Sequence, residues 1–262
     1  MTRCCSRMAS TTSRGVSCTG SARTLRARIE GRQSGRRVSE ERGLDQGALR
    51  LAGTGTSRGE EIANSLTHGL GAVLAVVGLV VLAFSASRHG TARTVVGCVV
   101  FGVSLVLLYA SSTLYHSVGN ARAKAVLRVF DHSAIFLLIA GTYTPFTLVS
   151  LRGPWGWSLF GVVWGLALAG ITLRLALRRR PTALFVTLYL AMGWCVVVAA
   201  KPLLAAVAPG GIALLVAGGL AYSVGVVFYV WRRPYHHAIW HAFVLAGSAF
   251  HFAAVLLYVA LA

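Results

Sequence analysis

The sequence predicts an all-helical integral membrane protein in which seven helices cross the bilayer. Hydrophobic residues make up 56% of the 262 residues and charged residues only 12%, a composition too apolar for a surface that faces water. From Ile62 onward, apolar stretches of about 18–25 residues alternate with short breaks that are basic or contain Gly or Pro. A helix needs about 20 apolar residues to cross the hydrocarbon core. Helices also satisfy every backbone polar group there without forming a closed barrel.

The seven predicted spans follow one another along the chain. Each begins where an apolar run begins and ends at the next break, which gives the approximate ranges 62–84, 94–116, 127–150, 155–173, 183–200, 211–231 and 236–261. Proline is disfavoured inside a helix. The breaks after the third to sixth spans each contain it, as Pro154, Pro181, Pro202 with Pro209, and Pro234.

The distribution of Lys and Arg predicts that the amino terminus is cytoplasmic. Basic residues are enriched in cytoplasmic loops of membrane proteins. With the amino terminus inside, the three cytoplasmic loops contain nine Lys or Arg and the three outer loops contain four. This orientation sets the depth of every polar residue: spans one, three, five and seven begin at the cytoplasmic face, and spans two, four and six end there.

Residues 1–59 are predicted to be a disordered tail, and residues 60–262 form the membrane domain. The tail is rich in Ser, Thr, Gly and Arg and contains no apolar run long enough for a core or a signal peptide. The formal net charge of +18 is divided between this tail and the loops, so we expect no nucleic-acid partner. Five cysteines without CxxC spacing favour neither a disulfide framework nor a thiolate zinc site.

Ionisable side chains within the spans are the candidates for function, because a charge at the bilayer centre costs ~2.5–3.5 kcal/mol even on insertion scales. After Glu61, the only carboxylate side chain in the sequence is Asp131. The predicted topology places one aspartate and four histidines at a similar depth near the cytoplasmic face, although they come from four spans: His68, His116, Asp131, His237 and His241.

His237 and His241 suggest a metal site. They are four residues apart, so both imidazoles project from one face of a helix, as in helical metal sites. The same spacing also suits interfacial or hydrogen-bonding histidines. With His116 they would offer three nitrogens and one open position, as a catalytic zinc site does. Neither a thiolate nor a second carboxylate is expected on that side as a fourth ligand, and imidazole also suits nickel, iron or copper.

Asp131 and Ser112 each allow two interpretations. Asp131 could cap the start of the third span and pair with Arg128. Alternatively, it could stand beside a metal-bound water and accept its proton. Ser112 lies one turn before His116 on the same helical face. Its hydroxyl could form a hydrogen bond near the ligands, or it could bond to its own helix backbone.

The remaining histidines of the spans are expected outside the ligand set. His68 has a suitable depth to contact a ligand histidine or a substrate. His251 lies ten residues beyond His241, ~15 Å along a helix axis, and is expected to form a hydrogen bond inside the bundle. His132 and His236 are each rotated by about 100° from a neighbouring candidate, so both are expected to face away from the site.

Four blocks of sequence are together far more specific than the histidine pair. They are EEIANSLTHG at 60–69, SSTLYHS at 111–117, DHSAIFLLIAGTYTP at 131–145 and YHHAIWHAFVLAGSAFHF at 235–252. On these blocks the chain resembles the hemolysin III family, the bacterial branch related to the progestin and adipoQ receptors, over about residues 60–262.

The resemblance implies a seven-helix membrane protein with a zinc ion near the cytoplasmic side. It implies that His116, His237 and His241 bind the ion, that Asp131 holds the zinc-bound water and that Ser112 belongs to the same set. More distantly, the chain is similar to a superfamily that includes alkaline ceramidases. In those enzymes, the same residue types support amide hydrolysis in a lipid.

The leading hypothesis is therefore a zinc-dependent hydrolase of the cell membrane that acts on a lipid amide or ester. One alternative is a pore-forming cytolysin, as the family name suggests. Another is a receptor-like or membrane-homeostasis protein in which zinc only holds spans two, three and seven together. In each case membrane lipid is the expected substrate or ligand. The sequence specifies neither the lipid nor the oligomeric state.

Overall fold

The computed structural model describes residues 57–177, 181–231 and 233–262. The tail predicted for residues 1–59 lies almost entirely outside these ranges. The described residues form helices and connecting turns without a strand, and seven of the helical segments are long and apolar enough to cross a membrane. The prediction of a seven-helix membrane bundle is confirmed.

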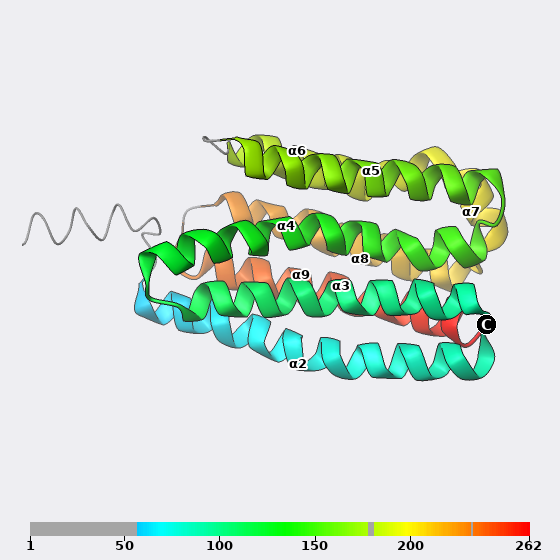
Figure 1. Ribbon diagram of the computed structural model, residues 1–262, viewed down its shortest axis with the longest axis horizontal. Coiled ribbons are helices and arrows are strands. Elements are labelled where there is room, and N and C mark those ends of the chain that lie inside the picture. Colours follow the sequence, from blue (N-terminus) through cyan, green and yellow to red (C-terminus); the bar gives the residue numbers. More distant parts are fainter. Residues whose placement is uncertain (1–56, 178–180, 232) are drawn as a thin grey trace, which may run out of the picture. The chain divides into compact units, whose positions relative to one another are not determined.

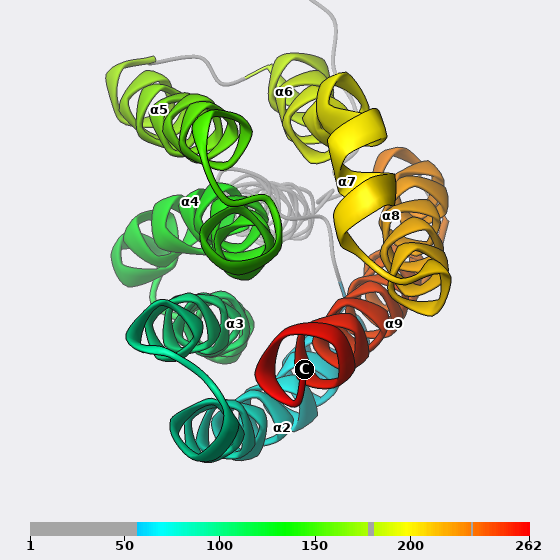
Figure 2. The ribbon, with the colours of Figure 1, turned by 90° about the vertical axis from the view of Figure 1, so that its right-hand side faces the viewer.

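The helices follow the chain in a simple order. They are α2 (Arg58–His89), α3 (Ala92–Ser117), α4 (Ala121–Pro145) continued by the π-helix η1 (Phe146–Ser150), α5 (Pro154–Ala176), α6 (Thr182–Trp194) continued by the 3₁₀-helix η2 (Cys195–Ala199) and α7 (Ala200–Ala206), α8 (Pro209–Val230), and α9 (His236–Val255) continued by the π-helix η3 (Leu256–Ala260). The helices run along one common direction (Figure 1). Seen end-on they form a ring in which α9 returns to pack against α2 (Figure 2).

Polar caps start the first three helices before their apolar runs. The hydroxyl of Ser57 accepts a hydrogen bond from the backbone N–H of Glu60, whose carboxylate accepts one from the N–H of Ser57. Asn120 caps α4 by accepting from the N–H groups of Arg122 and Ala123. The predicted spans began at the first apolar residue and therefore missed these polar turns.

The predicted break at Lys201 and Pro202 is wrong, because the fifth crossing continues through η2 and α7 to Ala206. Pro202 is the third residue of α7. The N–H groups in the first turn of a helix have no intrahelical partner, so a proline costs little there. The fifth crossing is thus a broken helix rather than a short one.

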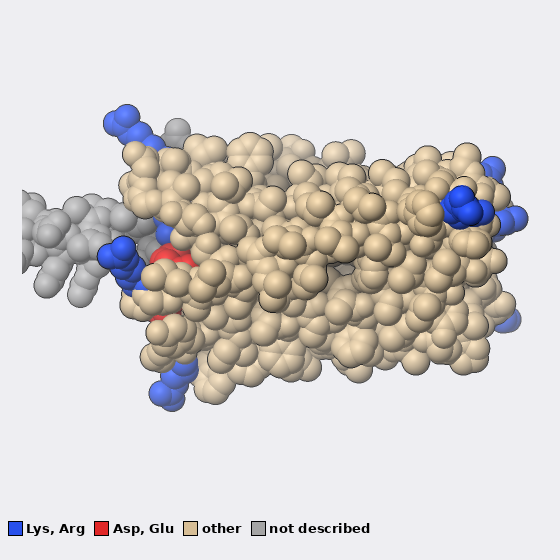
Figure 3. All heavy atoms as spheres, turned by 90° about the horizontal axis from the view of Figure 1, so that it is seen from below, with Lys and Arg blue, Asp and Glu red and all other residues tan. Residues whose placement is uncertain are grey.

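The outward faces of the bundle are apolar, as expected for contact with lipid. Large aliphatic side chains are well exposed along the crossings, for example Val73 at 63%, Leu168 at 60% and Val198 at 75%. Lys and Arg gather at the two ends, and the surface between them is free of charge in the view of Figure 3. The protein is accordingly a multi-pass membrane protein. The cytoplasmic location of the amino-terminal end stays a prediction from loop charge.

Helices α3 and α4 pack closely where Gly97 faces Pro145. A Cβ atom placed on Gly97 would lie 2.9 Å from the Cα of Pro145, a backbone atom that cannot turn aside as a side chain can. Gly161 on α5 is exposed, and a Cβ atom there would meet no atom within 4 Å.

We therefore expect Gly97→Ala to destabilise the bundle and Gly161→Ala to leave it unchanged or slightly more stable. Overpacking typically costs ~1–3 kcal/mol, whereas Gly to Ala in an open helix position gains up to ~1 kcal/mol. Thermal unfolding of both variants in the same detergent measures the difference. Equal melting temperatures for the two variants would contradict this account of the α3–α4 contact.

Candidate metal centre

Three histidines from two helices converge inside one end of the bundle. His116 lies in the last turn of α3, and His237 and His241 lie in the first two turns of α9. One ligand atom from each lies within 4.8 Å of the others. The ring centroids are 4.6 Å apart for the α9 pair and 5.2 Å from His116 to each of them. The three residues that the sequence placed at one depth therefore form one cluster.

The start of α9 is held in place by the start of α2. Tyr235, the residue before α9, adopts the left-handed conformation with φ 57°, which is costly for a residue with a side chain. Its backbone N–H donates to Oε1 of Glu60 at 2.8 Å. This bond fixes the turn from which His237 and His241 project on one helical face.

Glu61 is a site residue that the sequence interpretation missed. Its Oε2 lies 2.8 Å from Nδ1 of His116, and its Oε1 lies 2.8 Å from Nζ of Lys124 at the start of α4. We expected no second carboxylate on this side, because Glu61 was placed before the first span. A signal was nevertheless present. Glu61, Asn64 and His68 recur at i, i+3 and i+7, so they form a polar stripe on an otherwise apolar helix.

Asp131 and Ser112 lie next to each other near His116, and both line the same cavity as His237 and His241. Asp131 is about three turns into α4, whose cap is Asn120, so the interpretation of Asp131 as an N-cap is wrong. The Ser112 side chain is buried, and its hydroxyl makes no hydrogen bond of good geometry with its own helix. Their roles in chemistry stay predictions.

The other histidines take different positions. His68 is buried and stacks on His241 with ring centroids 3.4 Å apart, and neither ring nitrogen of His68 has a hydrogen-bond partner among the described residues. His251 donates from Nε2 to the carbonyl of Leu215 at 3.1 Å, which confirms its predicted hydrogen bond inside the bundle.

The two histidines that were expected to face away from the site, His132 and His236, have different surroundings. His236 bonds to the carbonyl of Phe228 through Nδ1 at 2.9 Å. His132 does not face away: it lines the cavity, and its Nδ1 lies 3.4 Å from Oδ2 of Asp131.

A largely apolar cavity of about 230 Å³ extends from the histidines into the bundle. Its polar end includes His68, Ser112, Asp131, His237 and His241. Along α4, η1 and the residue that follows, the lining residues run from residue 131 to residue 151, ~30 Å at 1.5 Å per residue.

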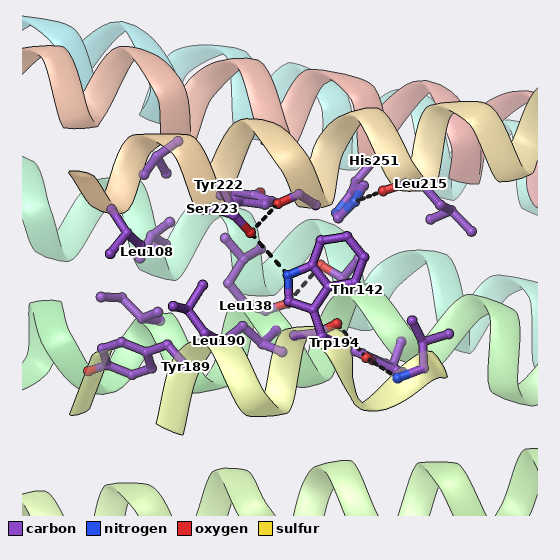
Figure 4. A pocket seen from close by; sticks show the side chains of 18 of the residues that line it. Leu108, Leu138, Thr142, Tyr189, Leu190, Trp194, Leu215, Tyr222, Ser223 and His251 are labelled. Atoms are coloured by element: carbon purple, nitrogen blue, oxygen red, sulfur yellow. Dashed lines mark hydrogen bonds between the residues drawn. The ribbon is translucent and has the colours of Figure 1, made fainter. Parts of the chain in front are cut away.

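Figure 4 shows the middle of this cavity, where Trp194 reaches from α6 to donate to Ser223 of α8 at 3.0 Å. The site therefore lies at one end of a long apolar space.

The arrangement fits a metal ion. Nε2 of His116 is buried and has no hydrogen-bond partner among the described residues, which is costly for a polar atom unless something binds there. Three imidazole nitrogens can hold a divalent ion and leave a position open for a ligand. The donor atoms favour a borderline metal such as zinc, copper or nickel, but they do not select one of them.

Comparisons with known proteins agree with this architecture. A family model described as Haemolysin-III related matches residues 56–252. Hemolysin-3 of Bacillus cereus is 50% identical over 201 residues, which cover 76% of this chain and 92% of that protein. The Hemolysin-3 homolog of Bacillus subtilis (strain 168) is 50% identical over 200 residues, covering 76% and 94%. The human Monocyte to macrophage differentiation factor is 28% identical over 212 residues, covering 76% and 84%.

We predict that protein purified in detergent contains a divalent metal and that His237→Ala/His241→Ala loses it. Removing two of three ligands leaves a single imidazole, which cannot hold the ion. His251→Ala is the matched control, because it removes a half-buried histidine of the same helix that lies outside the cluster. Elemental analysis of the three proteins gives the answer. Equal metal in wild type and the double variant would refute the ligand assignment.

Proposed function

Because the chain belongs to the haemolysin-III related family, we propose that it is a zinc-dependent membrane hydrolase that cleaves an amide or ester bond in a lipid. The observation that carries this proposal is the position of the three-histidine cluster, of which His237 and His241 line the polar end of a long apolar cavity. An acyl chain fits the apolar part, and a carbonyl group at its end would then meet the histidines.

His116, His237 and His241 would hold the zinc ion. A bound zinc ion supplies a Lewis acid that polarises a carbonyl and activates water at neutral pH. Catalytic zinc sites commonly keep three protein ligands and one open position, which matches the three side chains of this cluster. A structural zinc site is normally closed by a fourth protein ligand, so the set of three favours catalysis over a purely structural role.

Asp131 is the proposed general base. Its carboxylate lies beside His116 and Ser112 at the polar end of the cavity, where it can accept a proton from an attacking water. The Ser112 hydroxyl can donate to that carboxylate and so hold it in position. His68, stacked behind His241, lines the cavity with ring nitrogens that have no hydrogen-bond partner among the described residues, so it is placed to contact the polar part of the lipid.

If the amino terminus is cytoplasmic, as loop charge predicts, this site lies near the cytoplasmic face. The acyl chain would then extend toward the outer leaflet, and the polar product would leave toward the cytoplasm.

We expect Asp131→Ala to retain the metal and to lose hydrolysis of a lipid amide or ester by at least ~10²-fold, the lower end of what a general base contributes. Release of a fluorescent acyl product by the purified variants, measured beside their metal content, tests this. His237→Ala is the companion variant, expected to lose both metal and turnover. An Asp131→Ala protein with wild-type turnover would rule out the base role. A wild type that binds metal but cleaves no lipid, and that unfolds when a ligand is replaced, would favour the structural-zinc alternative.

Dye release from vesicles distinguishes the proposed hydrolase from a pore-forming cytolysin. We expect purified wild type to leave dye-loaded phospholipid vesicles intact after reconstitution, because the described helices form a closed ring around an apolar space rather than a polar channel. Dye retention relative to protein-free vesicles is the measurement. Rapid, concentration-dependent dye release would instead support the cytolytic function.

A further inference from the structure

Helix α2 contributes no residue to the three-histidine cluster, yet it contacts two of the three histidines behind their rings. Oε2 of Glu61 lies 2.8 Å from Nδ1 of His116. The carbonyl oxygen of Asn64 and the hydroxyl of Thr67 each lie 3.2 Å from Nδ1 of His241. All three α2 contacts therefore use the same ring nitrogen, Nδ1.

These contacts define which ring nitrogen is free to bind a metal. A carboxylate and a backbone carbonyl can only accept hydrogen bonds, so Nδ1 of His116 and Nδ1 of His241 must each carry the proton. In a neutral imidazole the other nitrogen, Nε2, then has no proton and offers its lone pair. In His116 this Nε2 is the buried atom without a hydrogen-bond partner among the described residues. Glu61 therefore lies behind the ring, on the side away from the unpartnered nitrogen.

The Glu61 carboxylate is itself held from a third helix. Its second oxygen, Oε1, accepts from Nζ of Lys124 at 2.8 Å, and the Glu61 and Lys124 side chains are only 17% and 15% exposed. With one oxygen on His116 and the other on Lys124, the carboxylate has little freedom to rotate. It joins the starts of α2 and α4 to the end of α3, where His116 lies.

We propose that Glu61, fixed by Lys124, is the positioning residue of the metal centre: it sets the tautomer and orientation of His116 and strengthens that imidazole as a ligand. A carboxylate that accepts from a ligand imidazole fixes its ring and raises its basicity, and loss of such a partner typically costs ~10–100-fold in metal affinity. The inference rests on the proposed metal centre but is independent of any hydrolytic reaction.

The test measures metal affinity in full-length protein purified in detergent, by competition for zinc with a chelator. We expect Glu61→Ala to weaken binding by ~10–100-fold. Glu61→Gln should weaken it less, because its amide oxygen still accepts from Nδ1 of His116 but carries no charge. Ser65→Ala is the matched control. It removes the 2.7 Å hydrogen bond between Ser65 of α2 and Ser117 of α3, one turn from Glu61, and touches no ligand. We expect its zinc affinity to equal that of wild type.

Absorption spectra of the cobalt(II) forms provide a second readout, because a reoriented His116 changes the ligand geometry of a bound ion. Glu61→Gln keeps the size and the acceptor, so it tests the inference even if Glu61→Ala does not fold. If His116→Ala loses metal while both Glu61 variants bind it with wild-type affinity and spectra, the positioning role is refuted and the metal centre stands. If wild type binds no metal at all, the proposed centre and this inference both fail.

Discussion

The convergence of the histidines depends on two adjacent carboxylates at the start of α2. Glu60 accepts from the backbone of Tyr235 and fixes the turn into α9, while Glu61 bridges His116 of α3 and Lys124 of α4. His116 is buried, and a polar group buried without a partner costs several kcal/mol in a weakly polar interior, so its contact with Glu61 is strongly favoured once the helices assemble. One turn of α2 thereby sets the relative positions of the helix ends that carry the site.

Much of the fold and of the three-histidine cluster could be predicted from sequence, because both follow from local patterns. Span length is dictated by membrane thickness, and the i, i+4 pair of α9 must share a face. His116 joined them because the alternation of spans places the end of the second span and the start of the seventh at the same face. Glu61 could not be found in this way, because its role depends on how α2 packs against α3 and α4. Likewise, the sequence did not show that α4 is capped at Asn120, about three turns before Asp131.

The cavity was beyond prediction for a related reason. Apolar spans predict that side chains face lipid or one another, but whether they leave an internal space depends on how helices of the ring fit together. Small residues in the surrounding helices leave room for polar side chains to form contacts within that space. Gly218 of α8 lies directly against the ring of His251, where a Cβ atom would meet the imidazole, and so lets this histidine reach the carbonyl of Leu215. The sequence shows that residue 218 is a glycine, but it does not show which side chain packs against it.

The scarcity of acid in this basic protein has a physical explanation at the candidate centre. From residue 57 onward the only carboxylate side chains are Glu60, Glu61 and Asp131. Three neutral imidazoles would leave both charges of a divalent ion uncompensated, and such a charge is very unfavourable in a low-dielectric interior. Glu61 behind His116 and Asp131 beside it bring two carboxylates close to the candidate ion site. Carboxylates elsewhere in the crossings would carry the cost of burial without that compensation. With an ion bound, this electrostatic requirement would account for the positions of Glu61 and Asp131.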